Sequence, residues 1–360
     1  MKICLIGQNL TNLILASLFT KKKLKVDLYL KNNFLNHKTN RTIAISADNF
    51  KYLNDLKIQP VSFWKSKEIK IYVENLKSQE IINFKTKKKE TFNLISYFKF
   101  KKSLINKIKK SKYVNMININ ASHSNLINKT KSYDLVINSE NDNIISKKFF
   151  YNKIKKDYKS YAYTFIIDHN KIENYIASQI FTKFGPLAFL PISRKQTSIV
   201  FSYFGKNVSD EKILELFKNY NSLYNINRIS NIEKFPINFL MLRNYIHKNI
   251  LAFGDLIHRI HPLAGQGFNM TIRDIKSLSN IIDQKLYLGL PVDISVAEEF
   301  QKSNKHLNYL YGKAIDGIYE FFKFDSQFNS LISKSLFKVL NKNLKFKKYS
   351  SILSDRGLNL

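Results

Sequence analysis

Three of the ten glycines in this 360-residue chain fall within one fourteen-residue segment. The segment opens with Gly254-Asp255 directly after the apolar run ILAF, and it closes with Gly265-Gln266-Gly267 before a stretch with helical apolar spacing. A glycine at a strand end lets a ligand approach the backbone, and a carboxylate beside it can accept hydrogen bonds from a polyol. N–H groups at a helix start favour a negative group. The segment therefore predicts a site for a ligand that carries both kinds of group.

Two other interpretations of the segment stay open. It also fits an ordinary strand-to-helix turn, and His258 and His261 also fit a pair of metal ligands. A metal site is disfavoured because no Cys or acid follows at ligand spacing. The single Cys4 further excludes a disulfide scaffold and a zinc site built on cysteines. We therefore predict no metal.

The chain around this segment must position it. Its N-terminal stretch has the order strand, turn, helix, strand, over residues 2–6, 7–12, 13–19 and 25–30. This order is typical of the first unit of a dinucleotide-binding fold. The apolar run at 133–138 predicts a strand that returns to the same sheet.

Strand patterns also occur at 69–73 and 80–84 and again across 161–204, whereas the chain from 268 onward has a helical pattern. We predict an α/β fold in which a Rossmann-like domain is interleaved with a mainly β domain, followed by C-terminal helices. The predicted boundaries are 1–60, 95–158 and 236–290 for the Rossmann-like domain, 61–94 and 159–235 for the β domain, and 291–360 for the helices.

The net charge of +32 arises from 59 Lys and Arg against 27 Asp and Glu. Lysine is spread over the whole chain together with abundant Asn, which is more typical of drift in an AT-rich genome than of a nucleic-acid surface. We therefore predict no nucleic-acid partner and keep a membrane surface as the alternative. The chain shows no signal peptide and no window of roughly 18 apolar residues, so we expect a cytoplasmic protein.

The stretch GDLIHRIHPLAGQGFNMTIRD resembles the second flavin-binding motif of the FAD-dependent aromatic hydroxylases, which share the p-hydroxybenzoate hydroxylase fold. It is more similar to the ubiquinone-biosynthesis branch, whose motif reads GDAAHxxHPLAGQGxNxGxxD. Three further segments resemble that branch, so the resemblance covers nearly the whole chain. They are RTIAIS at 41–46, FTKFGPLAFLP at 181–191 and the helical stretch 297–317.

The resemblance implies that the Rossmann-like domain binds FAD and that the β domain holds the substrate. It assigns FAD contacts to Gly7, Asn9, Asn12, Arg41, Glu140, Gly254, Asp255, Pro262, Ala264, Gly265, Gln266, Gly267 and Asn269. The substrate wall is expected at Leu187, Phe189 and Pro191. No catalytic side chain is obligatory, because the cofactor carries the oxygen chemistry.

The sequence departs from the family at the adenosine end of the site. The G-x-G-x-x-G fingerprint is Gly7-Gln8-Asn9-Leu10-Thr11-Asn12, and Leu30 followed by Lys31 replaces the acid expected for the ribose. The A-D-G motif appears as Ser139-Glu140-Asn141. We expect Asn9 to keep the tight turn through its tolerance of left-handed backbone, and Asn12 to open the helix–strand contact slightly.

The resemblance implies a monooxygenase that uses FAD and O2 to hydroxylate the ring of a polyprenylated phenol in ubiquinone biosynthesis, through a C4a-hydroperoxyflavin. The external electron donor would be NAD(P)H or a reductase. The alternative is a flavin-free or weakly flavin-binding accessory protein of a ubiquinone-synthesis complex, and a third option is a flavin-dependent reductase of prenyl double bonds. The basic stretch 334–348 suits peripheral docking on the inner face of a membrane.

Overall fold

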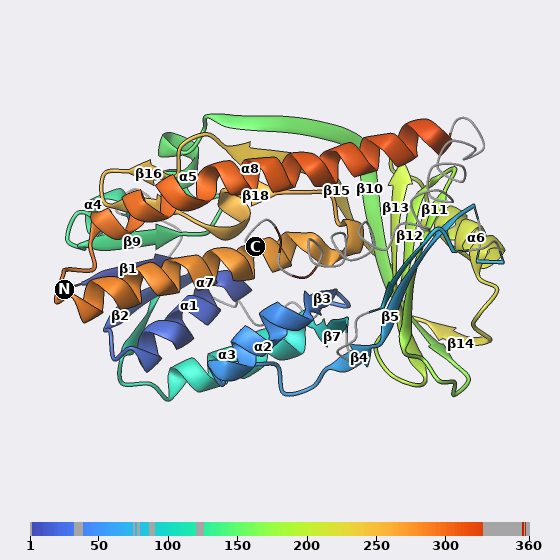
Figure 1. Ribbon diagram of the computed structural model, residues 1–360, viewed down its shortest axis with the longest axis horizontal. Coiled ribbons are helices and arrows are strands. Elements are labelled where there is room, and N and C mark those ends of the chain that lie inside the picture. The colour runs from blue at the N-terminus through green and yellow to red at the C-terminus, as the bar shows by residue number, and fades with distance from the viewer. Residues whose placement is uncertain are drawn as a thin grey trace.

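The computed structural model describes residues 2–31, 39–74, 76–77, 80–85, 91–119, 126–326, 355 and 357. Figure 1 shows a layered part of helices and strands at one end and a large sheet at the other. Two long helices, α7 (Gln266–Tyr287) and α8 (Ile294–Asp325), run along the molecule and connect the two parts. Within the described residues, no helix is both long enough and apolar enough to cross a membrane.

The first sheet has six strands in the order β16-β17-β9-β1-β2-β8. Their bounds are Ile3–Ile6 for β1, Val26–Lys31 for β2, Val114–Ile119 for β8, Leu135–Asn138 for β9, Ile246–His247 for β16 and Ile250–Ala252 for β17. β1 pairs in parallel with β2 and β9, and β9 pairs in parallel with β17. The loops that follow β1, β9 and β17 therefore converge at one edge of this sheet.

Helices cover this sheet because every residue of β1 and β9 is buried, so both faces of these strands need apolar partners. The remaining helices of this part are α1 (Leu10–Lys21), α2 (Ala47–Asp55), α3 (Tyr97–Lys109), α4 (Leu126–Thr130) and α5 (Ile144–Phe149). α1 contacts both α3 and α7. All its residues from Leu10 to Phe19 are buried, so this helix has apolar contacts all round rather than on one face.

The second sheet has the order β18-β15-β10-β13-β12-β11-β5-β6, and β14 also pairs with β10. Its strands are β5 (Glu68–Val73), β6 (Ile82–Lys85), β10 (Lys153–His169), β11 (Ile176–Thr182), β12 (Gly185–Pro191), β13 (Gln196–Phe204), β14 (Ile226–Ile229), β15 (Glu233–Leu242) and β18 (His258–Arg259). Helix α6 (Asp210–Tyr220) covers one face, with Ile213 and Phe217 in a core shared with Phe165. The other face is turned toward the first part.

A third, small sheet lies between the two large sheets. It consists of β3 (Thr42–Ser46), β7 (Phe92–Ser96) and β4 (Trp64–Ser66), with β7 in the centre. β3 contacts α7, and β7 contacts both α2 and α3. One face of this sheet therefore packs on the first part, while Phe92 and Leu94 of β7 join Ile69 and Ala177 of the second sheet in a separate apolar cluster.

The strands do not respect all of the predicted domain boundaries. β15 crosses the boundary predicted between residues 235 and 236, and β10 starts at Lys153, within the segment assigned to the Rossmann-like domain. β18 follows the first sheet in the chain but pairs with β15 of the second. Long strands and one short returning strand thus join the two parts. α8 lies in the region predicted to be helical, and the basic stretch 334–348 lies outside the described residues.

Gly185, in the turn between β11 and β12, should be important for stability. Gly185 has a φ of +125°, and a Cβ there would lie 1.9 Å from the backbone oxygen of Ser202. Gly205 also has a positive φ, of +100°, but nothing lies within 4 Å of its Cβ position. We expect Gly205→Ala to lower the free energy of unfolding by about 1–3 kcal/mol through backbone strain. Gly185→Ala should lose about 1–3 kcal/mol more, because its methyl group collides with backbone.

Urea unfolding of the two variants and the parent measures both losses. Equal losses for the two glycines would contradict the packing argument, because only the collision with Ser202 distinguishes them.

Candidate active site

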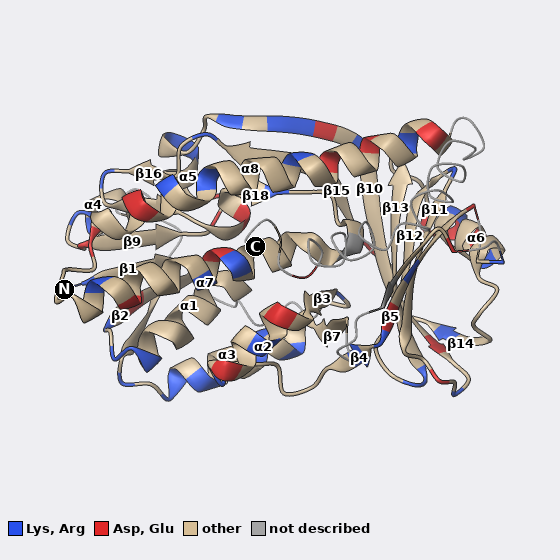
Figure 2. Ribbon diagram, viewed as in Figure 1, with Lys and Arg blue, Asp and Glu red and all other residues tan. Residues whose placement is uncertain are grey.

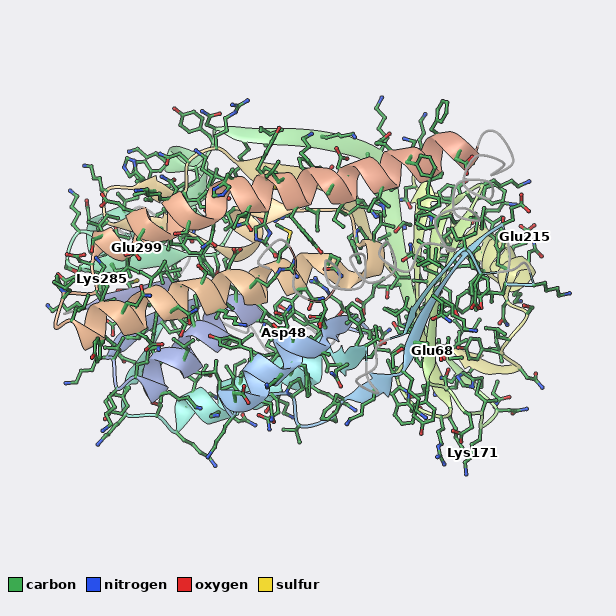
Figure 3. All side chains as sticks on the ribbon, in the orientation of Figure 1. Asp48, Glu68, Lys171, Glu215, Lys285 and Glu299 are labelled. Carbon is green, nitrogen blue, oxygen red and sulfur yellow. The ribbon has the colours of Figure 1, made fainter. Side chains whose placement is uncertain are left out.

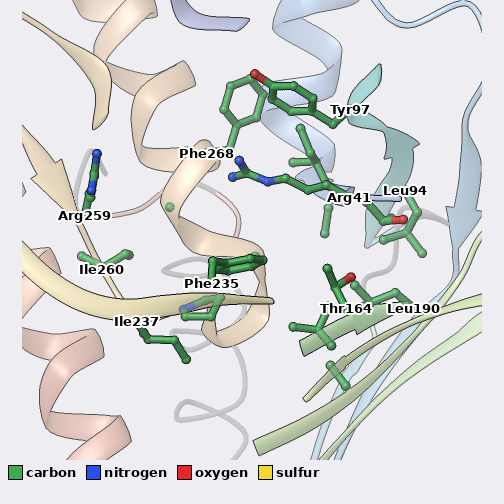
Figure 4. A pocket seen from close by; sticks show the side chains of 18 of the residues that line it. Arg41, Leu94, Tyr97, Thr164, Leu190, Phe235, Ile237, Arg259, Ile260 and Phe268 are labelled. Carbon is green, nitrogen blue, oxygen red and sulfur yellow. The ribbon is translucent and has the colours of Figure 1, made fainter. Parts of the chain in front are cut away.

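A cavity of about 630 Å³ lies where the converging loops of the first sheet face the second sheet (Figure 4). The loops contribute Asn9, Leu10, Thr11, Asp255, Pro262, Gly265, Gly267 and Phe268. The second sheet contributes Ile69, Thr164, Ala177, Gln179, Ala188, Leu190, Val200, Phe235, Pro236 and Ile237, together with the polar Ser178, Glu233, Asn238, His258 and Arg259, and the small sheet contributes Phe92 and Leu94. The cavity thus joins a glycine-rich end to a mainly apolar end.

Gly254 and Asp255 lie together at the glycine-rich end. Gly254 has a φ of +60°, and a Cβ there would lie 2.9 Å from Oγ1 of Thr11. A larger residue would therefore collide with the first turn of α1. Asp255 follows in the 3₁₀ turn η2 (Gly254–Leu256) and lines the cavity. Its carboxylate can accept hydrogen bonds from the hydroxyl groups of a ligand there.

The N-terminus of α7 forms another wall. Gly265 precedes this helix with a φ of +66°, and its Cβ position lies 3.0 Å from Cβ of Ala44, so glycine is needed there. No side chain among the described residues caps the helix. Its first N–H groups lack intrahelical partners and carry the positive end of the helix dipole. Because Pro262, Gly265 and Gly267 line the cavity, a ligand with developing negative charge can bind at this point.

One of the predicted contact residues, Gln266, points away from the cavity. The hydroxyl of Tyr311 donates to Oε1 of Gln266 at 2.6 Å, which holds Gln266 toward α8. The side chain of Ala264 lies outside the described part of the chain. Gln266 is therefore better explained as a link between α7 and α8 than as a ligand contact.

Asn269 is also buried, and it joins α7 to the small sheet. Its Nδ2 donates to the backbone oxygens of Ala44 (2.8 Å) and Gly265 (2.9 Å). Its Oδ1 accepts from the backbone N–H of Ser46 and from Nδ2 of Asn49, both at 2.9 Å. The four bonds of this one amide thus fix β3 and the start of α2 against the loop that ends at Gly265. Asn269 positions the site and does not line it.

The fingerprint residues adopt a different arrangement from the expected one. Asn9 has φ −81° and ψ 170°, which is extended backbone, so its tolerance of left-handed conformation is not used. It is instead the N-cap of α1. Asn12 is fully buried, and its Nδ2 donates to the backbone oxygen of Gly7 at 3.2 Å. Gly7 and Glu140 border a second, very small cavity on the far side of this loop.

Arg41 lies at the entry to β3 and lines the cavity. Its guanidinium carbon is 5.2 Å from the ring centroid of Tyr97, a cation–π contact. Figure 4 shows Arg41, Tyr97 and Phe268 grouped on one side of the cavity. Burial raises the pKa of Tyr97, so this phenol stays neutral beside the arginine. The guanidinium can also bind a planar or anionic group of a ligand.

The predicted substrate wall needs a correction on β12. Side chains alternate between the two faces of a strand. Leu187 and Phe189 are fully buried in the core beneath α6, whereas Ala188 and Leu190 line the cavity. Pro191 is buried as well and does not line it. The prediction named alternate residues of the strand, and two of them, Leu187 and Phe189, fill the core on its opposite face.

The two histidines have separate partners. Nε2 of His258 lies 2.6 Å from Oδ2 of Asp274, and Nδ2 of Asn308 donates to the other oxygen of this carboxylate at 3.0 Å. This buried contact ties β18 to α7 and α8. Among the described residues, no group of three or more His, Cys, Asp or Glu side chains could hold a metal ion.

His261 lies under the loop, away from the cavity. Its ring stacks on Tyr319 with the centroids 4.1 Å apart, and neither ring nitrogen has a hydrogen-bond partner among the described residues. Burial lowers the pKa of His261 to about 3, so the ring is neutral at physiological pH. It therefore fixes the loop to α8 by packing.

Sequence reasoning did not find several residues of the apolar end, among them Thr164, Val200, Phe235 and Leu94. The strand register shows how Thr164, Val200 and Phe235 come together. Thr164 pairs with Val200 on one side, and its neighbour Ala162 pairs with Phe235 on the other. Alternation along these strands was visible in the sequence, but which of the two faces meets a cavity was not.

Several solved structures with this architecture are named as monooxygenases. PqsL of P. aeruginosa, in complex with 2-aminobenzoylacetate, matches with a TM-score of 0.71 at 14% identity, over 93% of this chain and 99% of that one. p-Nitrophenol 4-monooxygenase PnpA of Pseudomonas putida DLL-E4 matches with a TM-score of 0.76 at 9% identity, over 98% and 97%. The chain therefore has the fold of the FAD-dependent aromatic monooxygenases, as its motifs predicted.

Comparison of the sequence with characterised proteins finds hydroxylases of ubiquinone biosynthesis. The ubiquinone biosynthesis monooxygenase COQ6 of Dictyostelium discoideum is 26% identical over 189 residues, which are 42% of this chain and 38% of that protein. The 3-demethoxyubiquinol 3-hydroxylase of Escherichia coli is 26% identical over 149 residues, 39% and 38% of the two chains. These matches confirm the resemblance to the ubiquinone-biosynthesis hydroxylases. The chain spans about 38% of the length of these relatives, and no protein-family model matches it.

Asn269 allows a stability test of the site. We expect Asn269→Ala to lower the free energy of unfolding by about 2–4 kcal/mol, because buried backbone groups of Ala44, Gly265 and Ser46 lose their partner. Asn115→Ala is a matched control, since its hydrogen bond to Asp27 is exposed, and it should change stability by less than about 0.5 kcal/mol. Urea titration measures both. Similar small losses would show that Asn269 does not hold β3 in place.

Proposed function

We propose that the chain is an FAD-dependent monooxygenase that hydroxylates the aromatic ring of a polyprenylated phenol in ubiquinone biosynthesis. The observation that carries the proposal is the single cavity that joins the Gly254–Asp255 and Gly265–Gly267 loops to the apolar face of the second sheet. A polar cofactor end and an apolar substrate end must be continuous if oxygen is to pass from one to the other. The similarity to COQ6 and to the bacterial hydroxylase supports the same assignment.

The glycine-rich end fits a flavin. Gly254 and Gly265 leave open backbone where a Cβ would intrude, and Asp255 can hold the ribityl hydroxyls. The uncapped N-terminus of α7 can stabilise negative charge at the pyrimidine edge of the ring. Bound FAD, once reduced, would supply the reaction with O2. The residues of this chain would bind it, orient it and keep the adjoining cavity dry.

The apolar end fits an aromatic substrate. Leu94, Leu190 and Phe235 line it from three different strands (Figure 4), so a hydrophobic ring and substituent find apolar contacts on several sides. Thr164 is the polar residue among the labelled side chains at this end, and its hydroxyl can pair with a phenolic hydroxyl. These apolar contacts suit a phenol with an apolar substituent.

The alternative of a flavin-free accessory protein is not favoured. Gly254 and Gly265 retain a positive φ next to crowded neighbours, a conformation that costs energy for any other residue. The relatives that the chain resembles are named as monooxygenases and hydroxylases. The electron donor is proposed to be external, NAD(P)H or a reductase.

The test of this function is flavin content together with oxygen incorporation. We expect the purified chain to take up FAD and to add one oxygen atom from ¹⁸O₂ to a prenylated phenol in the presence of a reductant. Asp255→Ala should weaken flavin binding by about 10- to 100-fold, because a charged acceptor for the ribityl hydroxyls is lost. Asp55→Ala, an exposed aspartate at the end of α2, is the control.

Flavin fluorescence and mass spectrometry of the product read out both steps. A chain that takes up no flavin, or a product that gains hydrogen in place of oxygen, would contradict the proposal. The second result would instead favour a reductase of prenyl double bonds.

We further propose that the chain docks on an anionic membrane surface, where a prenylated substrate would reside. The turn between α7 and α8 presents Tyr287, Leu288 and Leu290 with 91%, 66% and 45% of their surface exposed. An ion pair between Lys22 and Asp283 places the lysine-rich segment 21–25 beside this turn. Exposed apolar side chains next to basic ones are typical of surfaces that insert into anionic lipid.

The charges around the turn between α7 and α8 also favour contact of this turn with an anionic membrane. Figure 2 shows lysines along the ends of the helices on this side of the molecule. Lys285 lies 4.0 Å from Glu299 (Figure 3), so its charge is partly neutralised. Lys21, Lys23 and Lys25 are exposed, and they supply the positive charge for the proposed contact.

Vesicle co-sedimentation tests the docking surface. We expect Tyr287→Ser combined with Leu288→Ser to weaken binding to vesicles containing phosphatidylglycerol by about tenfold or more at moderate salt, because two inserting side chains are lost. Val61→Ser is the control, since Val61 is an 85% exposed apolar residue elsewhere on the surface. Equal binding by both variants would show that the charge of the whole chain, and not this turn, holds the vesicles.

A further inference from the structure

We propose that this chain binds the flavin mononucleotide half of its cofactor and gains little from the adenosine half, so that FMN and FAD bind with comparable affinity. This inference rests on the proposed flavin function and adds its specificity. It follows from a contrast between two helix N-termini at the same edge of the first sheet. The N-terminus of α7 is open to the large cavity, whereas the chain's own side chains cap that of α1.

The cap on α1 is made by Asn9. Its Oδ1 accepts from the backbone N–H of Asn12 at 3.2 Å and from Oγ of Ser139 at 3.0 Å. Its Nδ2 donates to the backbone oxygen of Ser139, also at 3.0 Å. The N–H of Asn12, one of the helix N–H groups that could donate to a pyrophosphate, therefore already has a partner, and the Asn9 side chain is held on both sides. A pyrophosphate must displace this network to bind at α1.

Side chains also crowd the turn before α1. A Cβ on Gly7 would lie 2.9 Å from Oγ of Ser139 and 3.1 Å from Oε2 of Glu140, so these two groups already occupy the space beside Gly7. The cavity bordered by Gly7, Lys31, Glu140 and Asn143 has a volume of only about 20 Å³. That is room for about one water molecule. The cavity at the flavin end is about 630 Å³.

The charge at the end of β2 also disfavours adenosine. Dinucleotide sites place an Asp or Glu there, about 20 residues after the glycine turn, to accept hydrogen bonds from the adenosine ribose. Here β2 ends with Leu30, which is buried, and Lys31, which borders the small cavity. An ammonium group only donates hydrogen bonds and cannot replace the carboxylate as an acceptor.

Asn9 also lines the large cavity, but the contacts proposed for the flavin and ribityl parts do not involve its hydrogen-bond network. Asp255, Pro262 and Gly265 line the large cavity, and none of them takes part in the Asn9–Ser139 network. Loss of adenosine contacts therefore leaves the half of the site that both FMN and FAD use. Affinity should depend on that half.

Titration of the flavin-free full chain with FAD and with FMN, followed by flavin fluorescence, measures the selectivity directly. We expect the two dissociation constants to agree within about tenfold. A stronger preference for FAD would overturn the inference and leave the proposed function intact. Failure to bind either flavin would overturn both.

A variant that restores the dinucleotide features tests the cause. Asn9→Gly together with Lys31→Glu should tighten FAD by about tenfold or more and leave FMN within about threefold, because only FAD carries the ribose and second phosphate that these changes favour. Lys25→Glu is the control, since it makes the same charge change at an exposed position just before β2. An equal gain for FMN, or an equal gain from Lys25→Glu, would show that bulk charge and not the adenosine end sets the affinity.

Discussion

The parallel pairing of β9 with β1 on one side and β17 on the other is the constraint on which the site depends. It brings to one edge three loops that lie far apart in the chain, after Ile6, Asn138 and Ala252. The glycine-rich segment could not form a ligand site alone, because its glycines pack closely against other elements. Gly254 packs against the first turn of α1, and Gly265 packs against Ala44 of β3. The edge supplies the neighbours that give these glycines their function.

Buried polar side chains then fix the loops to the rest of the molecule. Asn269 bonds β3 to the start of α7, and Asp274 links β18 to both long helices through His258 and Asn308. Such groups are costly to bury unless every donor and acceptor is paired, which these nearly achieve. His261 fixes the same loop by ring stacking. These contacts hold the loops of the proposed flavin end in place, which favours the orientation of a bound cofactor.

The two ends of the predicted cofactor site have diverged in different ways. At the flavin end the chain keeps open backbone and an uncapped helix, while at the adenosine end Asn9, Asn12 and Glu140 fill the corresponding space with protein groups. Polar replacements of glycine can stabilise the apoprotein by capping a helix or a carbonyl. A chain under weak selection for adenosine contacts would accumulate such replacements, since they do not disturb the hydroxylation chemistry proposed at the opposite end.

The order of strands and helices and the glycine-rich segment could be predicted from sequence, because apolar periodicity and the φ preference of glycine act over a few neighbouring residues. The residues of β12 that line the cavity could not be predicted in this way. Leu187 and Ala188 lie on opposite faces of the strand, and only the packing of α6 decides which face is in the core. Asn9 and Asn269 were also beyond local reasoning, since their partners lie 130 and more than 220 residues away. The sequence by itself determined which loops carry the glycines of the proposed flavin site. The tertiary structure decided which side chains line the cavity there, because that choice depends on contacts between distant segments.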